Sequence, residues 1–350
     1  MNVPAWFHAP LPPASTAVAD HALELVHVIG HLPARYPLYH LGNNALHIGI
    51  YQRALQHPGV VVLHDVVLHH MMLGWLRQEE YISEFVYNFG SWSEEAAQQL
   101  WRERGRSAVH PRYFDFPMIR RVCESSVAVV VHNPAAARIV RKQVPTVPVH
   151  EIPLLNMPKA PARAVEALSL RLSFGLDPGR SLFGVFGYLR ETKRIDTAIR
   201  ACEAAGASLI VAGHCSRELA ASLGPLLTRP HVRRVEFLPS AAYRALMYCV
   251  DGCINLRSPS TGETSAGGLD VMACGKPVLY TASGETERFP PGACVRVEPG
   301  LSEFDNLVDA LVWLNRYRSD AREVGRSAAE YVRTCHGPAP VLERYAEVLT

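Results

Sequence analysis

The stretch from Arg257 to Val278 (RSPSTGETSAGGLDVMACGKPV) contains residues that could hold a phosphate. It follows an apolar run at 252–256 that predicts a buried strand. The composition of 269–273 predicts a helix that Gly275 and Pro277 end. Small residues lie between the two elements, at the start of the helix. Backbone N–H groups and the helix dipole favour an anion there, and small side chains let a phosphate approach closely.

Two carboxylates flank this turn. Glu263 stands just before it, and Asp270 follows seven residues later, which is about two helical turns. The same pattern could be an ordinary helix that follows a glycine-rich turn. The acids at both ends, placed after a buried strand, favour a site for a diphosphate-linked sugar.

The composition is that of a globular protein, with 350 residues, 48% hydrophobic, 19% charged and a net charge of +2. This length suggests two domains, and the small charge gives no indication of a nucleic-acid partner. The eight cysteines include no C-x-x-C pair, and most lie in apolar runs, as expected in a reducing compartment. The sequence shows neither a signal peptide nor an apolar run of about 20 residues that could span a bilayer. We expect a cytoplasmic protein and leave peripheral contact with the inner face of a membrane open.

Predicted strands and helices alternate along the chain. Strands are expected at 3–8, 38–41, 59–63, 127–131, 147–152, 181–186, 208–212, 232–238, 252–256, 277–280 and 294–297. Helices are expected at 16–30, 45–56, 68–89, 192–204, 218–227, 241–250, 303–317, 319–333 and 341–349, with one more after Pro134; Ser15 or Thr16 would cap the first. The proline-rich segment 154–162 predicts a linker. The pattern predicts an α/β protein with two doubly wound, Rossmann-like domains, 1–155 and 156–337.

Parallel sheets bind ligands at the carboxyl ends of their strands. The residues that follow the predicted strands are therefore candidates for a site: Asn43, Asn44, His64, Asp65, His132, Gly187, Gly213 and Glu263. Two domains that face each other would place these strand ends across one cleft, which is a common location for a site.

Two further patterns each have an ordinary and a functional interpretation. The segment 91–116 carries four arginines among aromatic side chains, which fits a solvated helix or a surface for an anionic acceptor or lipid head groups. His64 and Asp65, together with His69 and His70, are residue types that bind metals. Adjacent histidines on a helix point to different sides, which disfavours a metal site there.

Several segments resemble, in order and spacing, those of family 4 retaining glycosyltransferases, which have the GT-B fold and use nucleotide-diphosphate sugars. These segments are PLPP at 10–13, LGNN at 41–44, VVVLHDVVLHH at 60–70, VVHN at 130–133, EIP at 151–153, FGYLRETKRID at 186–196, LRSPSTGETS at 256–265 and MACGKPV at 272–278. The segment 338–350 resembles the family's last helix, which packs back on the first domain.

The resemblance implies a role for individual residues. It assigns donor binding to Gly187, Arg190, Lys193, Thr264, Ser265, Ala266 and Asp270. Lys193 would contact the diphosphate together with the N–H groups of 264–266, and Asp270 would bind the ribose hydroxyls. Glu263, His64 and Lys193 would form the catalytic set. The residues on the acceptor side would be Asn43, Asn44, Asp65 and His132.

The sequence departs from the family pattern at several points. The first domain is short, so part of the acceptor site is either absent or supplied by a partner subunit. Tyr188 stands where many members have arginine, and Thr16 replaces a glycine near which the phosphates would lie. The seven-residue spacing between Glu263 and Asp270 is shorter than the common one and matches a subgroup with a GETS motif.

The resemblance implies a metal-independent hexosyltransferase, as in polysaccharide biosynthesis. It would move a sugar from a UDP- or GDP-linked donor to a glycan, lipid-linked or small-molecule acceptor and would need no cofactor. Two alternatives stay open. One is a non-catalytic nucleotide-sugar binder or scaffold subunit of the same fold. The other is a metal-dependent hydrolase that uses the cluster from His64 to His70.

Overall fold

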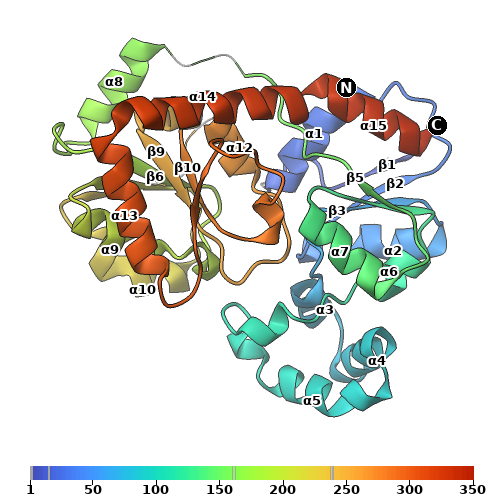
Figure 1. Cartoon of the computed structure of the whole chain (residues 1–350). Coiled ribbons are helices and arrows are strands. Elements are labelled where there is room, and N and C mark those ends of the chain that lie inside the picture. Colours follow the sequence, from blue (N-terminus) through green and yellow to red (C-terminus); the bar gives the residue numbers. More distant parts are fainter. Residues whose placement is uncertain (1–2, 15, 160, 162, 237, 239) are drawn as a thin grey trace. The chain divides into compact units, whose positions relative to one another are not determined.

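The computed structural model describes residues 3–14, 16–159, 161, 163–236, 238 and 240–350. The chain forms two compact units (Figure 1). Unit one comprises Met1–Met157, Pro259–Thr264 and Cys335–Thr350, and unit two comprises Pro158–Ser258 and Ser265–Thr334. The chain therefore passes from one unit to the other at 157/158, 258/259, 264/265 and 334/335.

Unit one is built on a five-stranded sheet in the order β1-β2-β3-β4-β5, and all its neighbouring strands are parallel. The strands are β1 (Phe7–His8), β2 (Leu38–Leu41), β3 (Val60–Leu63), β4 (Ala128–Val131) and β5 (Val149–Glu151). The middle strands are runs such as the VVVL of β3, whose residues are all buried. Such uniformly apolar strands fit a parallel sheet that helices cover on both faces.

Helices cover each face of this sheet. One face packs against α1 (Ala17–Ile29) and the C-terminal helix α15 (Pro338–Leu349). Tyr345 and Leu349 of α15 are buried in that core. The other face packs against α2 (Ile48–Gln56), α6 (Arg120–Glu124) and α7 (Pro134–Gln143). Thr16 caps α1 by accepting from Ala19 N–H at 3.1 Å, whereas Ser15 lies outside the described residues.

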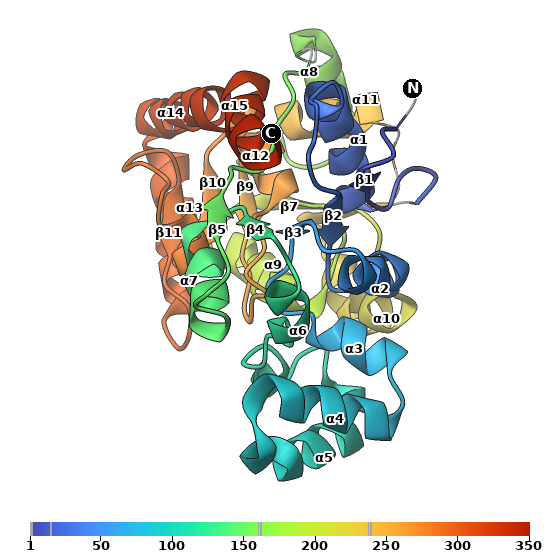
Figure 2. The same cartoon turned by 90° about the vertical axis from the view of Figure 1, so that its right-hand side faces the viewer.

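The segment that joins β3 to β4 is helical. It begins with α3 (His69–Trp75), and the helices α4 (Gln78–Phe89) and α5 (Glu94–Arg102) that follow lie on the side of α3 away from the sheet (Figure 1 and Figure 2). The predicted single helix at 68–89 is wrong, because the structure has α3 and α4 there. Leu76 is extended, and the Arg77 N–H donates to Glu80 Oε2 at 2.8 Å, which begins a new helix. After α4 the segment continues with η2 (Ser91–Ser93), α5, η3 (Arg104–Arg106) and η4 (Pro111–Tyr113). A further short helix, η1 (Ala45–His47), lies earlier in the chain, directly before α2.

Unit two is built on a six-stranded sheet in the order β11-β10-β9-β6-β7-β8, again with parallel neighbours. Its strands are β6 (Leu182–Phe186), β7 (Ser208–Ala212), β8 (Val232–Val235), β9 (Gly252–Asn255), β10 (Val278–Thr281) and β11 (Val295–Val297). The strand order reverses between β6 and β9. In doubly wound sheets, a ligand binds outside the carboxyl ends of the strands at such a point.

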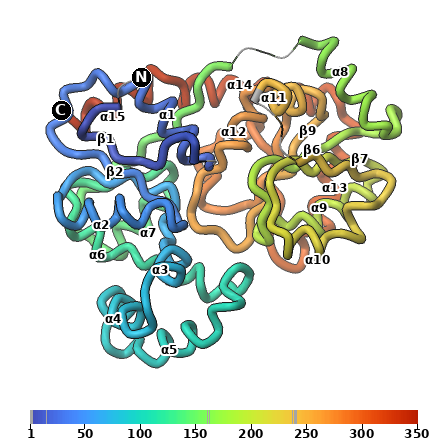
Figure 3. The backbone as a smooth tube through the Cα atoms, turned by 180° about the vertical axis from the view of Figure 1, so that it is seen from behind, coloured from blue at the N-terminus to red at the C-terminus, as the bar shows by residue number. Residues whose placement is uncertain are grey.

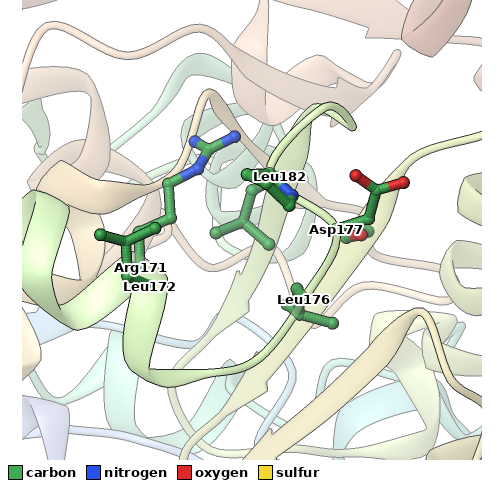
Figure 4. Close-up of a pocket in the computed structure, with 7 residues that line it drawn as sticks. Arg171, Leu172, Leu176, Asp177 and Leu182 are labelled. Carbon is green, nitrogen blue, oxygen red and sulfur yellow. The ribbon is translucent and has the colours of Figure 1, made fainter.

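The helices of unit two surround this sheet (Figure 3). They are α8 (Ala164–Ser173), η5 (Glu191–Lys193), α9 (Ile195–Ala204), α10 (Arg217–Leu227), α11 (Ser240–Cys249), α12 (Ala266–Ala273), η6 (Gly284–Thr286), α13 (Glu303–Arg316) and α14 (Arg318–Cys335). The sequence did not predict α8. A small pocket lies where β6 and β7 begin, lined by Leu182, Ser208 and part of α8 (Figure 4). That edge of the sheet is opposite the strand ends at which a ligand is expected.

Among the described residues, no helix combines the length and the apolar character that a membrane crossing requires.

Candidate functional site

The end of β6 places a buried ammonium group in unit two. Lys193 lies in η5 and is 6% exposed. Its Nζ donates a hydrogen bond to the carbonyl oxygen of Phe186, the last residue of β6. Gly187 follows with φ of 93°, and a Cβ at Gly213, after β7, would overlap the Gly187 carbonyl. Two glycines are therefore needed where the loops after β6 and β7 meet.

The first turn of α12 lies at the end of the neighbouring strand, β9. Ser265 caps this helix, and its Oγ accepts from Gly268 N–H at 3.2 Å. Ala266, Gly267 and Gly268 make up the first turn, so the helix begins three residues before the predicted 269–273. The first N–H groups of a helix have no acceptor within it, so this turn can bind an anion.

A second cation, Arg257, lies at the same helix start. Its Nη2 donates to Ser265 Oγ at 3.1 Å. Burial raises the pKa of the Cys253 thiol in β9 to about 12, and the charges of Lys193 and Arg257 oppose this rise. Both cations thus lie near Cys253. A cation at a helix N-terminus is disfavoured by the helix dipole unless an anion accompanies it.

Lys193 and the first turn of α12 both lie near the carbonyl oxygen of Phe186. A Cβ at Gly267 would lie 4.0 Å from the Phe186 carbonyl oxygen, to which Lys193 Nζ donates. We call Lys193, Arg257 and the first turn of α12 (residues 266–268) the cationic site. It lies at the carboxyl ends of β6 and β9, where the strand order reverses. Sequence reasoning missed Arg257, although a basic residue directly after a buried strand was a usable signal.

Asp270 lies one turn further along α12 and is paired. Its Oδ1 accepts from Lys159 Nζ at 2.7 Å, and the two side chains are 25% and 32% exposed. Burial raises the pKa of Tyr243, and the Asp270 carboxylate adds to this rise. The Tyr243 hydroxyl in turn accepts from Gly187 N–H at 2.5 Å. Asp270 therefore lies on the same side of unit two as Gly187. No local pattern in the sequence indicated Lys159.

Arg190 lies outside this set of contacts. Its guanidinium stacks over the Tyr188 ring, 5.4 Å from the centroid, and both residues are exposed. The Tyr188 ring in turn contacts His214, with 5.2 Å between ring centroids.

Glu263 is held within unit one by its own loop, Pro259–Thr264. Its Oε2 accepts from Thr261 N–H at 3.0 Å, Thr261 Oγ1 at 2.7 Å and Ser260 Oγ at 3.2 Å. Thr261 Oγ1 also lies 2.6 Å from Asp65 Oδ1. A hydroxyl has one hydrogen, so Thr261 can donate to only one of the two carboxylates at a time.

The same loop is tied to the strand ends of unit one. Val66 N–H donates to the Thr261 carbonyl at 2.9 Å. Asn133 Nδ2 donates to the Gly262 carbonyl at 2.9 Å and to Thr264 Oγ1 at 3.1 Å. Gly262 has φ of 78°, and a Cβ there would overlap the Val66 side chain. Residues of unit one therefore position Glu263 and Thr264, and Asn133 was not among the predicted site residues.

The acceptor-side asparagines bond within unit one. Asn43 N–H donates to Asp65 Oδ2 at 2.9 Å, Asn43 Oδ1 accepts from Met71 N–H at 2.9 Å, and its Nδ2 lies 2.9 Å from His70 Nδ1. Asn44 caps η1 by accepting from Leu46 N–H at 3.0 Å. These side chains hold the loop after β2, so a ligand would compete with structural hydrogen bonds.

His64 lies between two other histidines. Its Nε2 is 2.9 Å from His40 Nδ1, and its Nδ1 is 3.2 Å from His132 Nε2. His132 Nδ1 donates to the Ile152 carbonyl at 2.9 Å. A sugar hydroxyl could bond to the His64 ring only by displacing one of these histidines.

The metal cluster weighed for His64, Asp65, His69 and His70 does not form. His69 bonds to the Tyr113 carbonyl at 3.0 Å and to the Tyr81 hydroxyl at 2.7 Å, and His70 Nε2 donates to the Ser107 carbonyl at 2.9 Å. The helix directs the two adjacent rings to different partners, as helical geometry requires.

No protein family matches the chain, and no curated protein matches its sequence. Three solved structures are similar over most of its length. Sucrose-phosphate synthase from Thermosynechococcus elongatus has a TM-score of 0.64 at 16% identity, over 93% of this chain and 75% of its own. Anabaena HepE in complex with UDP-glucose has a TM-score of 0.59 at 14% identity, over 85% and 80%. WaaG, a glycosyltransferase involved in lipopolysaccharide biosynthesis, has a TM-score of 0.59 at 16% identity, over 98% and 85%.

The fold is that of GT-B glycosyltransferases. The prediction of an α/β protein with two Rossmann-like domains is thus confirmed. In this GT-B chain, the cationic site belongs to unit two, whereas Glu263 and the histidines around His64 belong to unit one.

Proposed function

We propose that the protein is a retaining glycosyltransferase that moves a sugar from a nucleotide-diphosphate sugar to a glycan, lipid-linked or small-molecule acceptor. The cationic site carries this proposal, because two cations and a helix N-terminus at the ends of β6 and β9 suit a diphosphate. The HepE structure with UDP-glucose supports a UDP-linked donor, and a GDP-linked donor is the alternative.

In the proposed reaction, the leaving diphosphate gains negative charge as its bond to the sugar breaks. Lys193 and the N–H groups beside Ser265 would stabilise that charge, which in many enzymes is the largest contribution to catalysis. Bond breaking would precede attack by the acceptor hydroxyl on the same face of the sugar. We assign no covalent nucleophile. With two cations at the site, the diphosphate would need no metal ion.

Asp270 would bind the ribose hydroxyls of the donor. Its Oδ1 is paired with Lys159 at 2.7 Å, so a donor that binds this oxygen would compete with the lysine. Both side chains are partly exposed, so the ion pair is weak enough to exchange.

A non-catalytic nucleotide-sugar binder of the same fold is the second candidate. The observation that favours it is the state of Glu263, whose Oε2 already accepts from Thr261 N–H and Ser260 Oγ and shares the Thr261 hydroxyl with Asp65. Such an acid can act as a structural element of the loop. Turnover separates this candidate from the enzyme.

Thermal unfolding with UDP, GDP, ADP and their sugars tests both candidates. A ligand that binds only the folded state stabilises it by about 2.7 kcal/mol at 100 times its dissociation constant. We expect one nucleoside diphosphate to raise the unfolding temperature, and its sugar to release that diphosphate when a cell extract supplies acceptors. Binding without release would favour the binder, and no stabilisation by any nucleotide would refute both.

A further inference from the structure

Histidines from separate elements gather in unit one at the carboxyl edge of its sheet. His21 lies in α1, His64 follows β3 and His132 follows β4. One ring nitrogen from each lies within 4.8 Å of those of the other two. The ring centroids are 5.3 Å apart for His21 and His64 and 5.0 Å apart for His64 and His132. His40, in β2, stacks on His64 with ring centroids 5.2 Å apart.

The hydrogen bonds of His132 identify its protonated nitrogen. Its Nδ1 lies 2.9 Å from the Ile152 carbonyl oxygen, which can only accept, so Nδ1 carries the proton. In the neutral ring the lone pair is therefore on Nε2, where it can accept the proton of His64 Nδ1 or bind an ion. This is the nitrogen that faces His64, at 3.2 Å from its Nδ1.

His21 has the same arrangement. It bonds to the backbone of Leu155, and its Nε2 is buried without a hydrogen-bond partner. Nδ1 must therefore make the bond to Leu155, and Nε2 has the lone pair. Buried nitrogens in folded proteins almost always have a partner, so an orphaned lone pair beside two other imidazoles requires an explanation.

Histidines that bind metals show this pattern. One nitrogen binds the ion, and the N–H of the other is usually held by a carbonyl or carboxylate. Two ligands at about 2.0–2.1 Å from a tetrahedral Zn²⁺ are roughly 3.3 Å apart. The 3.2 Å between His132 Nε2 and His64 Nδ1 fits that separation. With Nδ1 on the ion, His64 Nε2–H would donate to His40 Nδ1, now 2.9 Å away.

We propose that His21, His64 and His132 bind a divalent transition-metal ion, through Nε2 of His21 and His132 and Nδ1 of His64. Three imidazoles suit Zn²⁺, Co²⁺, Ni²⁺ or Cu²⁺ and leave a fourth position for water or an oxygen ligand. The three residues are buried, with 6–9% of each exposed. The ion would tie α1 to the ends of β3 and β4. This site goes beyond the proposed transfer reaction and does not depend on it.

The test uses the full-length protein after treatment with a chelator. Titration with Co²⁺ should give the visible absorption of a four- or five-coordinate ion, and calorimetry with Zn²⁺ should give one site per chain. X-ray absorption of the Zn²⁺-loaded protein should count about three imidazole ligands. These measurements use the unaltered chain, so they do not depend on whether a variant folds. Absence of one-to-one binding, or a count of one imidazole, would overturn the proposal.

Variants locate the ion. His21→Gln should weaken Zn²⁺ binding by about 100-fold or more, because one of three ligands is lost. His47→Gln is the matched control, because His47 is also buried in unit one and bonds to the His40 carbonyl at 3.0 Å but is outside the three-histidine group. Zn²⁺ should raise the unfolding temperature of the unaltered protein and of His47→Gln, and not that of His21→Gln. Equal Zn²⁺ affinity in all three proteins would place the ion elsewhere and refute the site.

Discussion

Replacing Lys193 with methionine removes one of the two cations of the cationic site while preserving its packing. Lys193 is only 6% exposed, so alanine would leave a cavity, whereas methionine fills a similar volume. The substitution also removes the hydrogen bond to the Phe186 carbonyl, and an unsatisfied buried acceptor costs about 1–3 kcal/mol. We therefore expect a folded protein whose unfolding temperature falls by several degrees.

The effect on the reaction should be larger than the effect on stability. Two unit charges 4 Å apart interact by about 4 kcal/mol at an effective dielectric constant of about 20. Arg257 stays in place, so the diphosphate keeps one cation and the helix N-terminus. Removing one preorganised contact of this kind lowers kcat about 10²- to 10³-fold, which is about 2.7–4 kcal/mol.

The assay is release of nucleoside diphosphate from the donor that the thermal screen identifies, with calorimetry for nucleotide affinity. Lys276→Met is the matched control. Lys276 belongs to the same unit, and burial lowers its pKa. It precedes β10, at the edge of the sheet opposite the cationic site. If Lys193→Met and Lys276→Met turned over donor at rates within about threefold of each other, a charge at Lys193 would not be what the reaction uses.

Three further substitutions test the neighbouring residues. Glu263→Gln keeps an oxygen acceptor for Thr261 and removes the charge, so kcat should fall about 10²-fold if the acid acts on the sugar; an unchanged rate with a lowered unfolding temperature would assign it to the loop. Lys159→Met removes the ion pair with Asp270, and calorimetry should show nucleoside diphosphate binding strengthened by up to about fivefold; weaker binding would contradict the role of Asp270. Gly262→Ala should lower the free energy of unfolding in urea by about 1–3 kcal/mol more than Gly275→Ala does. Both glycines have positive φ (78° and 71°), but of the two only Gly262 would place its new methyl group against another side chain, that of Val66. Equal losses of unfolding free energy in the two variants would show that the Val66 side chain moves aside.

Most strands could be predicted to within two residues because local chemistry decides them, whereas β1 covers only Phe7–His8 of the predicted 3–8 and β8 ends at Val235 rather than at 238. β2 and β7 begin and end where their apolar runs do, at Leu38–Leu41 and Ser208–Ala212. The helices were less certain, because apolar spacing continues across breaks. The pattern at 68–89 hides the turn at Leu76, which Glu80 sets by bonding to the Arg77 N–H.

The residues of the candidate site also fall into two groups: those that local sequence could place and those that only the tertiary structure brings together. A motif places Ser265 at a helix start, and Lys193 in the segment that follows β6, because both positions follow from neighbouring residues. The pairing of Lys159 with Asp270 spans 111 positions, and nothing local to either residue indicates it. His21 likewise meets His64 and His132 only through the packing of α1 on the sheet. Local sequence located the turn at the start of α12, and only the tertiary structure identifies which side chains bond to the residues around it.

The way in which the chain passes between the two units determines what proteolytic cleavage would do to the protein. Unit one takes its last helix, α15, and the loop Pro259–Thr264 from beyond the segment that leads into unit two. A protease that nicks the chain near 158–163 would therefore produce two pieces that each hold part of one hydrophobic core, with Tyr345 and Leu349 bound to the other piece. Neither piece can bury that core alone. The two halves should accordingly stay associated after cleavage and reassemble when expressed separately, which makes this chain suitable as a split reporter whose signal requires both fragments.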